Sequence, residues 1–176
     1  HIIEKTLSRL HIPDFTIHIN HRLIINGMLQ YFGLEGLSTE IIRLIDKRDK
    51  QDQASLQEEM KELGISEEVS KQVFTMVSFR GTGKDAIQYL EQMNIDNEQF
   101  WQGLQEMKDI LAIIQAMSLP QDSYIIDLSI MRGLDYYTGV VYETKLNTYP
   151  QFGSVCSGGR YDNLVGYYAD VDISGV

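Results

Sequence analysis

Asp14-Phe15-Thr16-Ile17-His18-Ile19-Asn20-His21-Arg22 is the stretch of sequence that decides the fold of this chain. Apolar and polar residues alternate from Phe15 to Asn20, and this is the period of a half-buried strand. From Ile24 to Phe32 the apolar residues recur at helical spacing instead. The pattern therefore predicts a strand that is followed directly by a helix over residues 14–33.

Four polar residues gather where this strand meets the helix, namely His18, Asn20, His21 and Arg22. One interpretation is that they face a substrate. The other is that they are simply the solvated end of a strand. We favour the solvated strand end, because polar and charged side chains are mostly exposed in folded proteins.

The segment between Ser38 and Pro120 has apolar residues at helical spacing and no stretch that alternates like a strand. About five helices are predicted here, and the last is a long one that begins near Asn97. The segment holds nine basic and fifteen acidic residues. A solvated helix surface explains the basic ones better than a patch that contacts phosphates; the residues in question are Arg43, Lys47, Arg48, Lys50, Arg80 and Lys84.

Strand patterns return after Pro120, over Ile126–Ile130, Thr138–Leu146 and Gly153–Ser157. Gly158-Gly159 is expected to end the third strand, and residues 162–168 are expected to begin a helix. Strands on both sides of a helical block predict an α+β fold in which the helices are an insertion. We divide the chain into a strand-and-helix segment (1–37), a helical insertion domain (38–120) and a second sheet segment (121–176).

Composition narrows the classes of protein that this chain can belong to. With 176 residues and 43% apolar content, it can form one ordinary domain or two small ones. A net charge of −10 argues against a general nucleic-acid binder but does not exclude a local contact with a nucleic acid. A single cysteine fits a reducing cytoplasm. No run approaches the roughly 20 apolar residues that a membrane span requires.

Three candidate sites are rejected, two on the spacing of their residues and one on its position in the sequence. Gly81-Thr82-Gly83-Lys84 lacks the first glycine and the final Ser/Thr of a phosphate-binding loop and is predicted to be a turn between helices. The histidines have no partners at metal-ligand spacing, so no metal site is predicted. Cys156 lies in a β-rich stretch before two glycines, which is an ordinary place for a buried thiol rather than a nucleophile.

Met131-Arg132-Gly133-Leu134-Asp135-Tyr136-Tyr137-Thr138-Gly139 combines a cation, a carboxylate and two adjacent phenols directly after a strand-like run. A fixed guanidinium can hydrogen-bond a carboxylate and a phosphate together and keeps its charge. A tyrosine hydroxyl can donate to or accept from a ring nitrogen. Ser157-Gly158-Gly159-Arg160-Tyr161-Asp162 follows, and its paired glycines allow close approach of the backbone.

These two motifs, in this order, resemble the two histidine motifs of histidyl-tRNA synthetases. The similarity extends to residues 14–22, which resemble the strand-to-helix segment after the second class II motif, and to the helical insertion. The resemblance implies an α+β fold with the helical insertion between segments of a mainly antiparallel class II synthetase sheet. It also implies that the ATP-binding motifs, the dimer-forming motif and the anticodon-binding domain lie outside this chain.

The resemblance assigns roles residue by residue. Arg132 matches the catalytic arginine, and Tyr136 and Tyr137 match the tyrosines that contact histidine. Gly158, Gly159 and Tyr161 match the second motif, which walls the amino-acid pocket. The implied activity is a histidine–tRNA ligase that forms histidyl-adenylate from histidine and ATP and then charges tRNA(His).

The same resemblance implies Mg²⁺ with the ATP, no tightly bound cofactor, a homodimeric parent protein, a cytoplasmic location and tRNA contact through the 38–120 insert. The alternative is the regulatory subunit of ATP phosphoribosyltransferase, which senses histidine without charging tRNA. The complete motif around Arg132 and the long insert favour the ligase. Because His1 opens inside a helix-like segment and Val176 has no polar tail after it, we expect an excised piece that is inactive alone.

Overall fold

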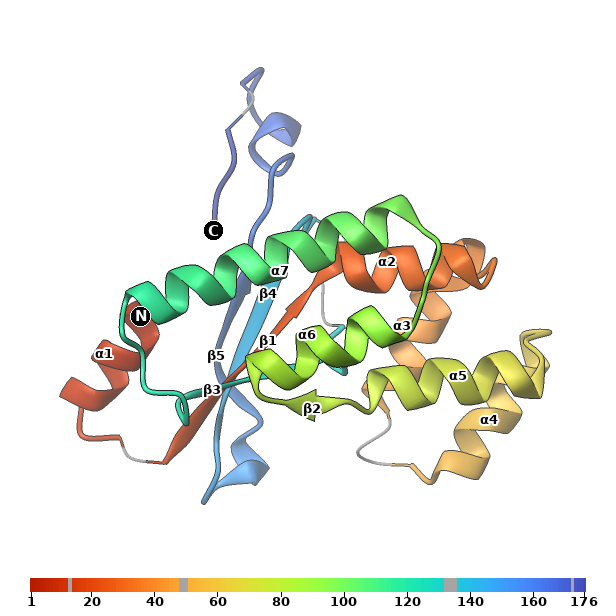
Figure 1. The fold of residues 1–176 in the computed structure, drawn as a ribbon, viewed down its shortest axis with the longest axis horizontal. Coiled ribbons are helices and arrows are strands. Elements are labelled where there is room, and N and C mark those ends of the chain that lie inside the picture. The colour runs from red at the N-terminus through yellow and green to blue at the C-terminus, as the bar shows by residue number, and fades with distance from the viewer. Residues whose placement is uncertain (13, 48–50, 132–135, 172) are drawn as a thin grey trace.

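Figure 1 shows the computed structural model of the chain, which describes residues 1–12, 14–47, 51–131, 136–171 and 173–176. In chain order its elements are α1 (Ile2–Arg9), β1 (Phe15–His21), α2 (Arg22–Tyr31), η1 (Glu35–Leu37), α3 (Ser38–Asp46), α4 (Gln53–Glu62), α5 (Glu67–Val77), β2 (Arg80–Gly81), α6 (Gly83–Gln92), α7 (Glu98–Ala116), β3 (Tyr124–Asp127), β4 (Val140–Leu146), η2 (Pro150–Phe152), β5 (Ser154–Gly159) and η3 (Val165–Tyr167). The strand and helix predicted over residues 14–33 are confirmed as β1 and α2.

The strands form one sheet in the order β2-β3-β1-β4-β5. β1 is the central strand, parallel to β3 and antiparallel to β4. The outer pairs, β2 with β3 and β4 with β5, are both antiparallel. The sheet is therefore mainly antiparallel, which confirms the predicted α+β class.

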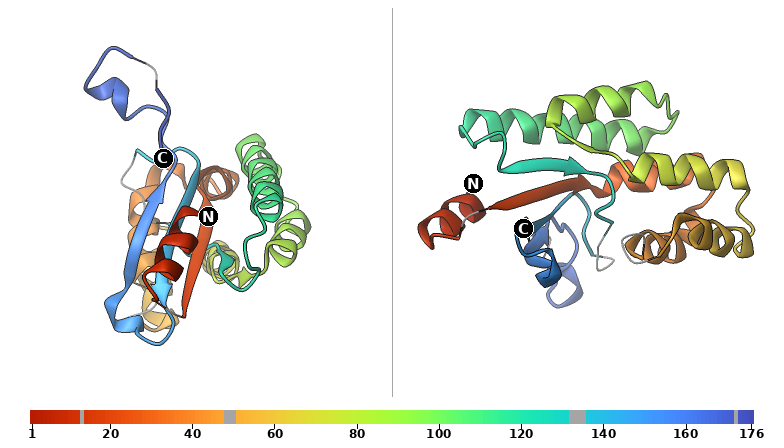
Figure 2. Two further views of the ribbon diagram at one scale, coloured as in Figure 1. Left: turned by 90° about the vertical axis from the view of Figure 1, so that its left-hand side faces the viewer. Right: turned by 90° about the horizontal axis from the view of Figure 1, so that it is seen from below.

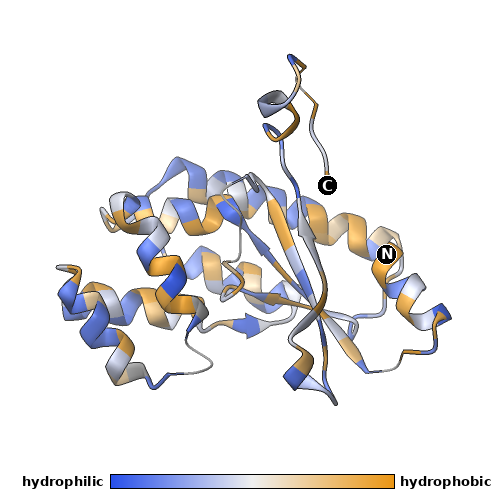
Figure 3. Cartoon of the chain, turned by 180° about the vertical axis from the view of Figure 1, so that it is seen from behind, coloured by the Kyte–Doolittle hydropathy of each residue, from blue (hydrophilic) through white to orange (hydrophobic). Residues whose placement is uncertain are grey.

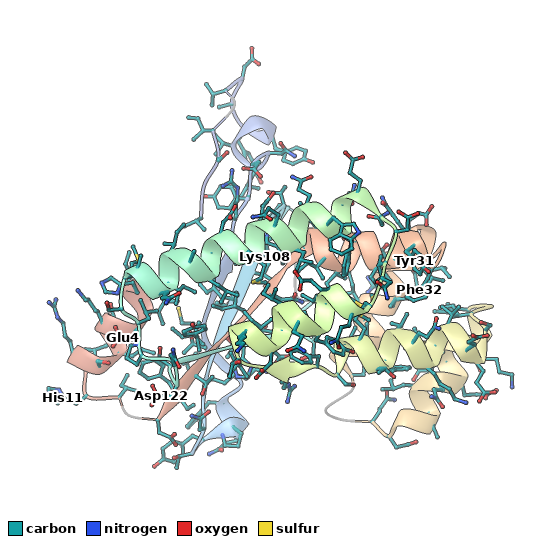
Figure 4. The ribbon with its side chains drawn as sticks, viewed as in Figure 1. Glu4, His11, Tyr31, Phe32, Lys108 and Asp122 are labelled. Atoms are coloured by element: carbon teal, nitrogen blue, oxygen red, sulfur yellow. The ribbon has the colours of Figure 1, made fainter. Side chains whose placement is uncertain are left out.

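The helices α6 and α7 lie on one side of the sheet in both views of Figure 2. Ile17 and Ile19 of β1 and Ile126 of β3 belong to the same buried apolar cluster as Leu104 and Met107 of α7. In Figure 3 the helices carry both polar and apolar segments, as amphipathic helices do. Lys108 projects from α7 toward α6 (Figure 4), where its Nζ lies 2.7 Å from Glu91 Oε1.

The long helix α7 packs against α2 at glycine contacts. A Cβ on Gly27 would lie 2.4 Å from the backbone nitrogen of Phe100, and one on Gly103 would lie 2.8 Å from that of Ile24. Asn97 caps α7 by accepting from the Phe100 amide at 3.0 Å. The apolar core is consequently continuous between the 38–120 block and the strand-and-helix segment, and the division at residues 38 and 120 stays a prediction.

Three expectations about local structure were wrong. The 38–120 block does contain a strand, β2, because Arg80 and Gly81 pair with Asp127 and Ile126. A pairing this short has no alternation of its own and arises from tertiary contact alone. Gly158-Gly159 does not end the third strand, since β5 pairs with β4 through Gly159. Residues 162–168 form no α-helix and hold only the short η3.

Candidate functional site

The two motifs lie side by side at the end of the β4–β5 pair. The Thr138 amide donates to the Arg160 carbonyl at 2.9 Å, and the Arg160 amide donates to the Val140 carbonyl at 2.8 Å. Asp162 accepts from the Thr138 hydroxyl and from the Arg160 guanidinium. These bonds extend the antiparallel ladder beyond β5, so the described part of the first motif runs alongside the second.

Three tyrosines from the two motifs form one aromatic cluster. The ring centroids of Tyr136 and Tyr137 lie 4.6 Å apart, and those of Tyr136 and Tyr161 lie 6.2 Å apart at an interplanar angle of 90°. Both arrangements are edge-to-face, the geometry that aromatic rings prefer. Residues that are 24 positions or more apart in sequence are thus joined here, as the two-motif prediction requires.

Tyr137 is a neutral phenol at physiological pH, as an ordinary tyrosine is. Burial raises its pKa to about 12, and a hydrogen bond with Tyr136 and the nearby Tyr136, Tyr142 and Tyr161 phenols act in the same direction. A neutral phenol keeps one donor and acceptor capacity at physiological pH. Tyr137 can therefore satisfy a partner that needs either role, such as a nitrogen of an imidazole ring.

The two glycines of the second motif serve opposite faces of the sheet, because neighbouring residues of a strand point to opposite sides. A Cβ on Gly158 would lie 2.5 Å from the Tyr142 hydroxyl oxygen. A Cβ on Gly159 would lie 2.7 Å from the Val140 carbonyl oxygen and 2.9 Å from Cδ1 of Tyr137. Gly159, and not Gly158, therefore borders the Tyr137 ring.

Gly159→Ala is expected to displace the Tyr137 ring and to weaken the binding of histidine, the ligand that the motif resemblance implies, by about 1–3 kcal/mol, the usual cost of forcing a methyl into a packed site. Calorimetric titration of histidine into the full-length protein measures the loss. Gly36→Ala is the control, because nothing lies within 4 Å of its Cβ position. Equal histidine affinity in the Gly159 and Gly36 variants would remove Gly159 from the pocket.

Arg132, the predicted catalytic residue, lies outside the described residues, as do Gly133, Leu134 and Asp135. The structure describes the chain on both sides of them. Met131 is fully buried, and Gly139 is buried at the start of β4. The amide of Arg22 donates to the Gly139 carbonyl at 2.9 Å, which ties the end of the motif to the start of α2.

The polar residues at the β1–α2 junction are buried, so the interpretation as a solvated strand end was wrong. His18, Asn20, His21 and Arg22 are each at most 9% exposed. The junction lies inside the sheet, where β3 and β4 cover β1 on either side. Buried polar groups need partners, and each of these side chains has one: Asp127, the carbonyls after β3, Glu106 and the Met131 carbonyl respectively.

A charged network on β1, β2 and β3 was not predicted. His18 Nδ1 lies 2.8 Å from Asp127 Oδ2, and Arg80 Nε lies 2.9 Å from the same oxygen. Burial alone would raise the pKa of Asp127, but hydrogen bonds from His18 and Ser129 and the charge of Arg80 outweigh it and hold the pKa well below its ordinary value. The partners are far apart in sequence, so no local pattern indicates the network.

A groove of about 560 Å³ lies between α7 and the β4–β5 end. His21 and Glu106 meet there at 3.0 Å, and Arg160 and Asp162 line the other side. Burial lowers the pKa of His21, although Glu106 opposes the shift. His21, Val140 and Arg160 share one face of the sheet, and Gly159 and Tyr137 lie on the other.

The basic residues of the helical block are partly used within the fold. Arg80 is paired with Asp127, and Lys47 Nζ lies 2.8 Å from Glu59 Oε2. Arg48 and Lys50 lie outside the described residues. Residues 81–84 join β2 to α6 and not one helix to another: Gly81 ends β2, Gly83 begins α6, and the Thr82 hydroxyl between them accepts from the Asp85 amide and so caps α6. These contacts give no support for a phosphate-binding loop at residues 81–84.

In the described part of the chain, no helix is long and apolar enough to cross a membrane. Among the same residues, no group of three or more His, Cys, Asp or Glu side chains is placed to hold a metal ion.

Comparison with known proteins gives consistent matches. The sequence model of the family described as histidyl-tRNA synthetase matches residues 1–174. The histidine–tRNA ligase of Clostridium tetani is 41% identical over 99% of this chain, and that of Helicobacter pylori is 35% identical over the same share. The chain spans about 40% of the length of these curated relatives.

Solved structures agree with the sequence matches. The crystal structure of histidyl-tRNA synthetase from Nostoc sp. superimposes with a TM-score of 0.93 at 32% identity, covering 98% of this chain and 41% of that one. A Bacillus halodurans protein, described as an ATP phosphoribosyltransferase regulatory subunit/histidyl-tRNA synthetase, superimposes with a TM-score of 0.73 at 26% identity, covering 94% and 42%.

Proposed function

Because this chain belongs to the histidyl-tRNA synthetase family, we propose that the whole protein is a histidine–tRNA ligase. It activates histidine with ATP to histidyl-adenylate and transfers the histidyl group to tRNA(His). The observation that carries the proposal is the meeting of the two motifs: Tyr136 and Tyr137 from one pack with Tyr161 and Gly159 from the other.

Histidine recognition is assigned to this cluster. The neutral hydroxyl of Tyr137 bonds one imidazole nitrogen, and the Tyr136 and Tyr161 rings wall the pocket. Because Gly159 has no side chain, the Tyr137 ring can lie directly against its backbone. Gly158 supports the pocket from the opposite face, where it accommodates Tyr142.

Arg132 is assigned to the chemical step. An oxygen of the histidine carboxylate attacks the α-phosphorus of ATP, the bond to the bridging oxygen breaks, and pyrophosphate leaves with the bond's electrons. Negative charge builds on the phosphoryl oxygens, and a fixed guanidinium stabilises it. Mg²⁺ would enter bound to ATP; since the described residues contain no candidate metal cluster, we assign none of them to it and no step to the ion.

The remaining proposals concern partners. The parent protein is proposed to be a homodimer that works in the cytoplasm, with the 38–120 helical block near bound tRNA. That block holds fifteen acidic and nine basic residues, so any contact with phosphates must be local.

Two assays on the full-length protein test the function. Histidine-dependent exchange of pyrophosphate into ATP reports adenylate formation, and charging of a tRNA(His) transcript reports transfer. Both are expected. Histidine binding without either activity would instead favour the regulatory subunit of ATP phosphoribosyltransferase, the description partly given to the Bacillus halodurans protein.

Tyr137→Phe is expected to raise the histidine KM while leaving the ATP KM unchanged. A buried group that loses its hydrogen-bond partner costs about 1–3 kcal/mol, or roughly 5- to 150-fold in KM. Pyrophosphate exchange measured against histidine concentration gives the value. Tyr31→Phe, at the exposed end of α2 (Figure 4), is the matched control. An unmoved histidine KM in the Tyr137 variant would transfer the imidazole contact to Tyr136.

A further inference from the structure

We propose that Asn20, assisted by Arg22, is a positioning residue for adenylate formation: it fixes the backbone on which the first histidine motif is mounted. The inference rests on the proposed ligase function, and it adds residues that lie more than 100 positions away from the motif in sequence. Neither residue is assigned a contact with substrate.

The side chain of Asn20 is fully buried and hydrogen-bonded at both ends. Its Nδ2 donates to the Ile130 carbonyl at 2.8 Å and to the Leu128 carbonyl at 3.2 Å. Its Oδ1 accepts from the His21 amide at 2.8 Å. One amide group thus holds the chain that leaves β3 against the end of β1, two residues before Arg132 in sequence.

Arg22 contacts the chain on both sides of residues 132–138. Its backbone amide donates to the Gly139 carbonyl at 2.9 Å, and its Nη1 donates to the Met131 carbonyl at 3.4 Å, which is long for a hydrogen bond. Residues 20 and 22 therefore contact the backbone immediately before and immediately after residues 132–138. The described backbone on either side of residues 132–135 is thus fixed by hydrogen bonds from one short stretch of β1 and α2.

The position of Asn20 in the sheet also links the first histidine motif to Gly159 of the proposed pocket. Asn20 pairs with Val141 in β4, and Val141 pairs with Gly159 in β5, so the three residues form one row across the sheet. A shift of the segment relative to this row would move Tyr137 relative to Gly159, which lie in close contact. Misplacement of a catalytic group by about 1 Å can cost about 10²-fold in rate.

The chemistry requires asparagine at this position and not aspartate. The two carbonyl oxygens need N–H donors, and an ionised carboxylate would face them with acceptors only. Asn20→Asp keeps the size and shape of the side chain and removes both donors. Arg22→Lys keeps the charge and removes the guanidinium donor to Met131.

Steady-state pyrophosphate exchange by the full-length protein tests the proposal. In Asn20→Asp and Arg22→Lys, kcat is expected to fall about 10- to 100-fold, with the ATP KM unchanged. Asn97→Ala is the control for a purely structural role: it removes the cap of α7 and lowers stability without touching the segment. Its kcat should stay at the wild-type value.

Hydrogen exchange of the Ile130 and Thr138 amides in the same proteins gives a readout independent of activity. Both amides are hydrogen-bonded near residues 132–135, and faster exchange in Asn20→Asp and Arg22→Lys than in Asn97→Ala is expected.

Wild-type protein without histidine-dependent pyrophosphate exchange would overturn the ligase function. Amide exchange would still show whether Asn20 and Arg22 hold the backbone around the motif. An active wild type whose Asn20 and Arg22 variants match Asn97→Ala in kcat would overturn the positioning role. If Asn20→Asp does not fold, Arg22→Lys alone decides.

Discussion

Arg132→Ala in the full-length protein is expected to lower the rate of adenylate formation roughly 10²–10³-fold, because one transition-state donor contributes about 3–4 kcal/mol. Histidine binding should change far less, since the role proposed for the arginine is to stabilise the charge that develops on the phosphate in the transition state. Arg132→Lys should recover little of the rate, as a lysine ammonium cannot bond two oxygens with the planar fork of a guanidinium.

Pre-steady-state formation of histidyl-adenylate measures this effect directly. Arg9→Ala is the control, because Arg9 is an exposed residue in the last turn of α1. It should retain the wild-type rate. An Arg132→Ala protein with near-normal turnover would remove Arg132 from the mechanism, whatever the position of the tyrosines.

Asp127→Ala is expected to destabilise the chain by about 3 kcal/mol, at the lower end of the range for removing one partner of a buried ion pair. The cost lies at the lower end of that range because the Arg80 side chain is 41% exposed and can be solvated when the carboxylate is lost. His18 also loses its bond to Asp127. Urea denaturation followed by circular dichroism measures the change. Asp122→Ala, in the exposed turn before β3 (Figure 4), should stay within about 0.5 kcal/mol of wild type.

The effect of Asp127 should depend on pH with a defined sign. The folded-state pKa of Asp127 lies well below its ordinary value of 3.8, so its contribution is complete above about pH 5 and is lost as pH falls below about 4. The stability gap between wild type and Asp127→Ala should therefore narrow between pH 6 and pH 3, values chosen to bracket that window. A gap that stays constant would show that the charge of Asp127 contributes nothing.

The parts of the fold with a long local pattern were predictable. Alternation over Phe15–Asn20 gave β1, and helical spacing gave α2 and α7, because each element presents one apolar face to the core. Elements that form only by pairing with a strand distant in sequence were not predictable. β2 is two residues long and is stabilised by pairing with β3, and Gly158 and Gly159 remain in a strand because β4 pairs with them.

The candidate site likewise contains some residues that the sequence predicted and others that it did not. The tyrosines and glycines were found because their types and order carry a motif, and the structure brings Tyr136, Tyr137, Gly159 and Tyr161 together. Asn20 and His18 were misread, because their partners Ile130 and Asp127 lie more than 100 positions away. The available signal is the alternation of polar and apolar residues in β1, and alternation alone does not tell a buried polar network from a solvated strand face.

A crystal structure of the full-length protein with bound histidine tests the central claim most directly. The imidazole is expected within hydrogen-bond distance of the Tyr137 hydroxyl and against the Tyr136 and Tyr161 rings. The competing position is the groove on the opposite face, where His21 and Glu106 meet. Histidine bound in that groove, with the tyrosine cluster empty, would contradict the assignment of the pocket.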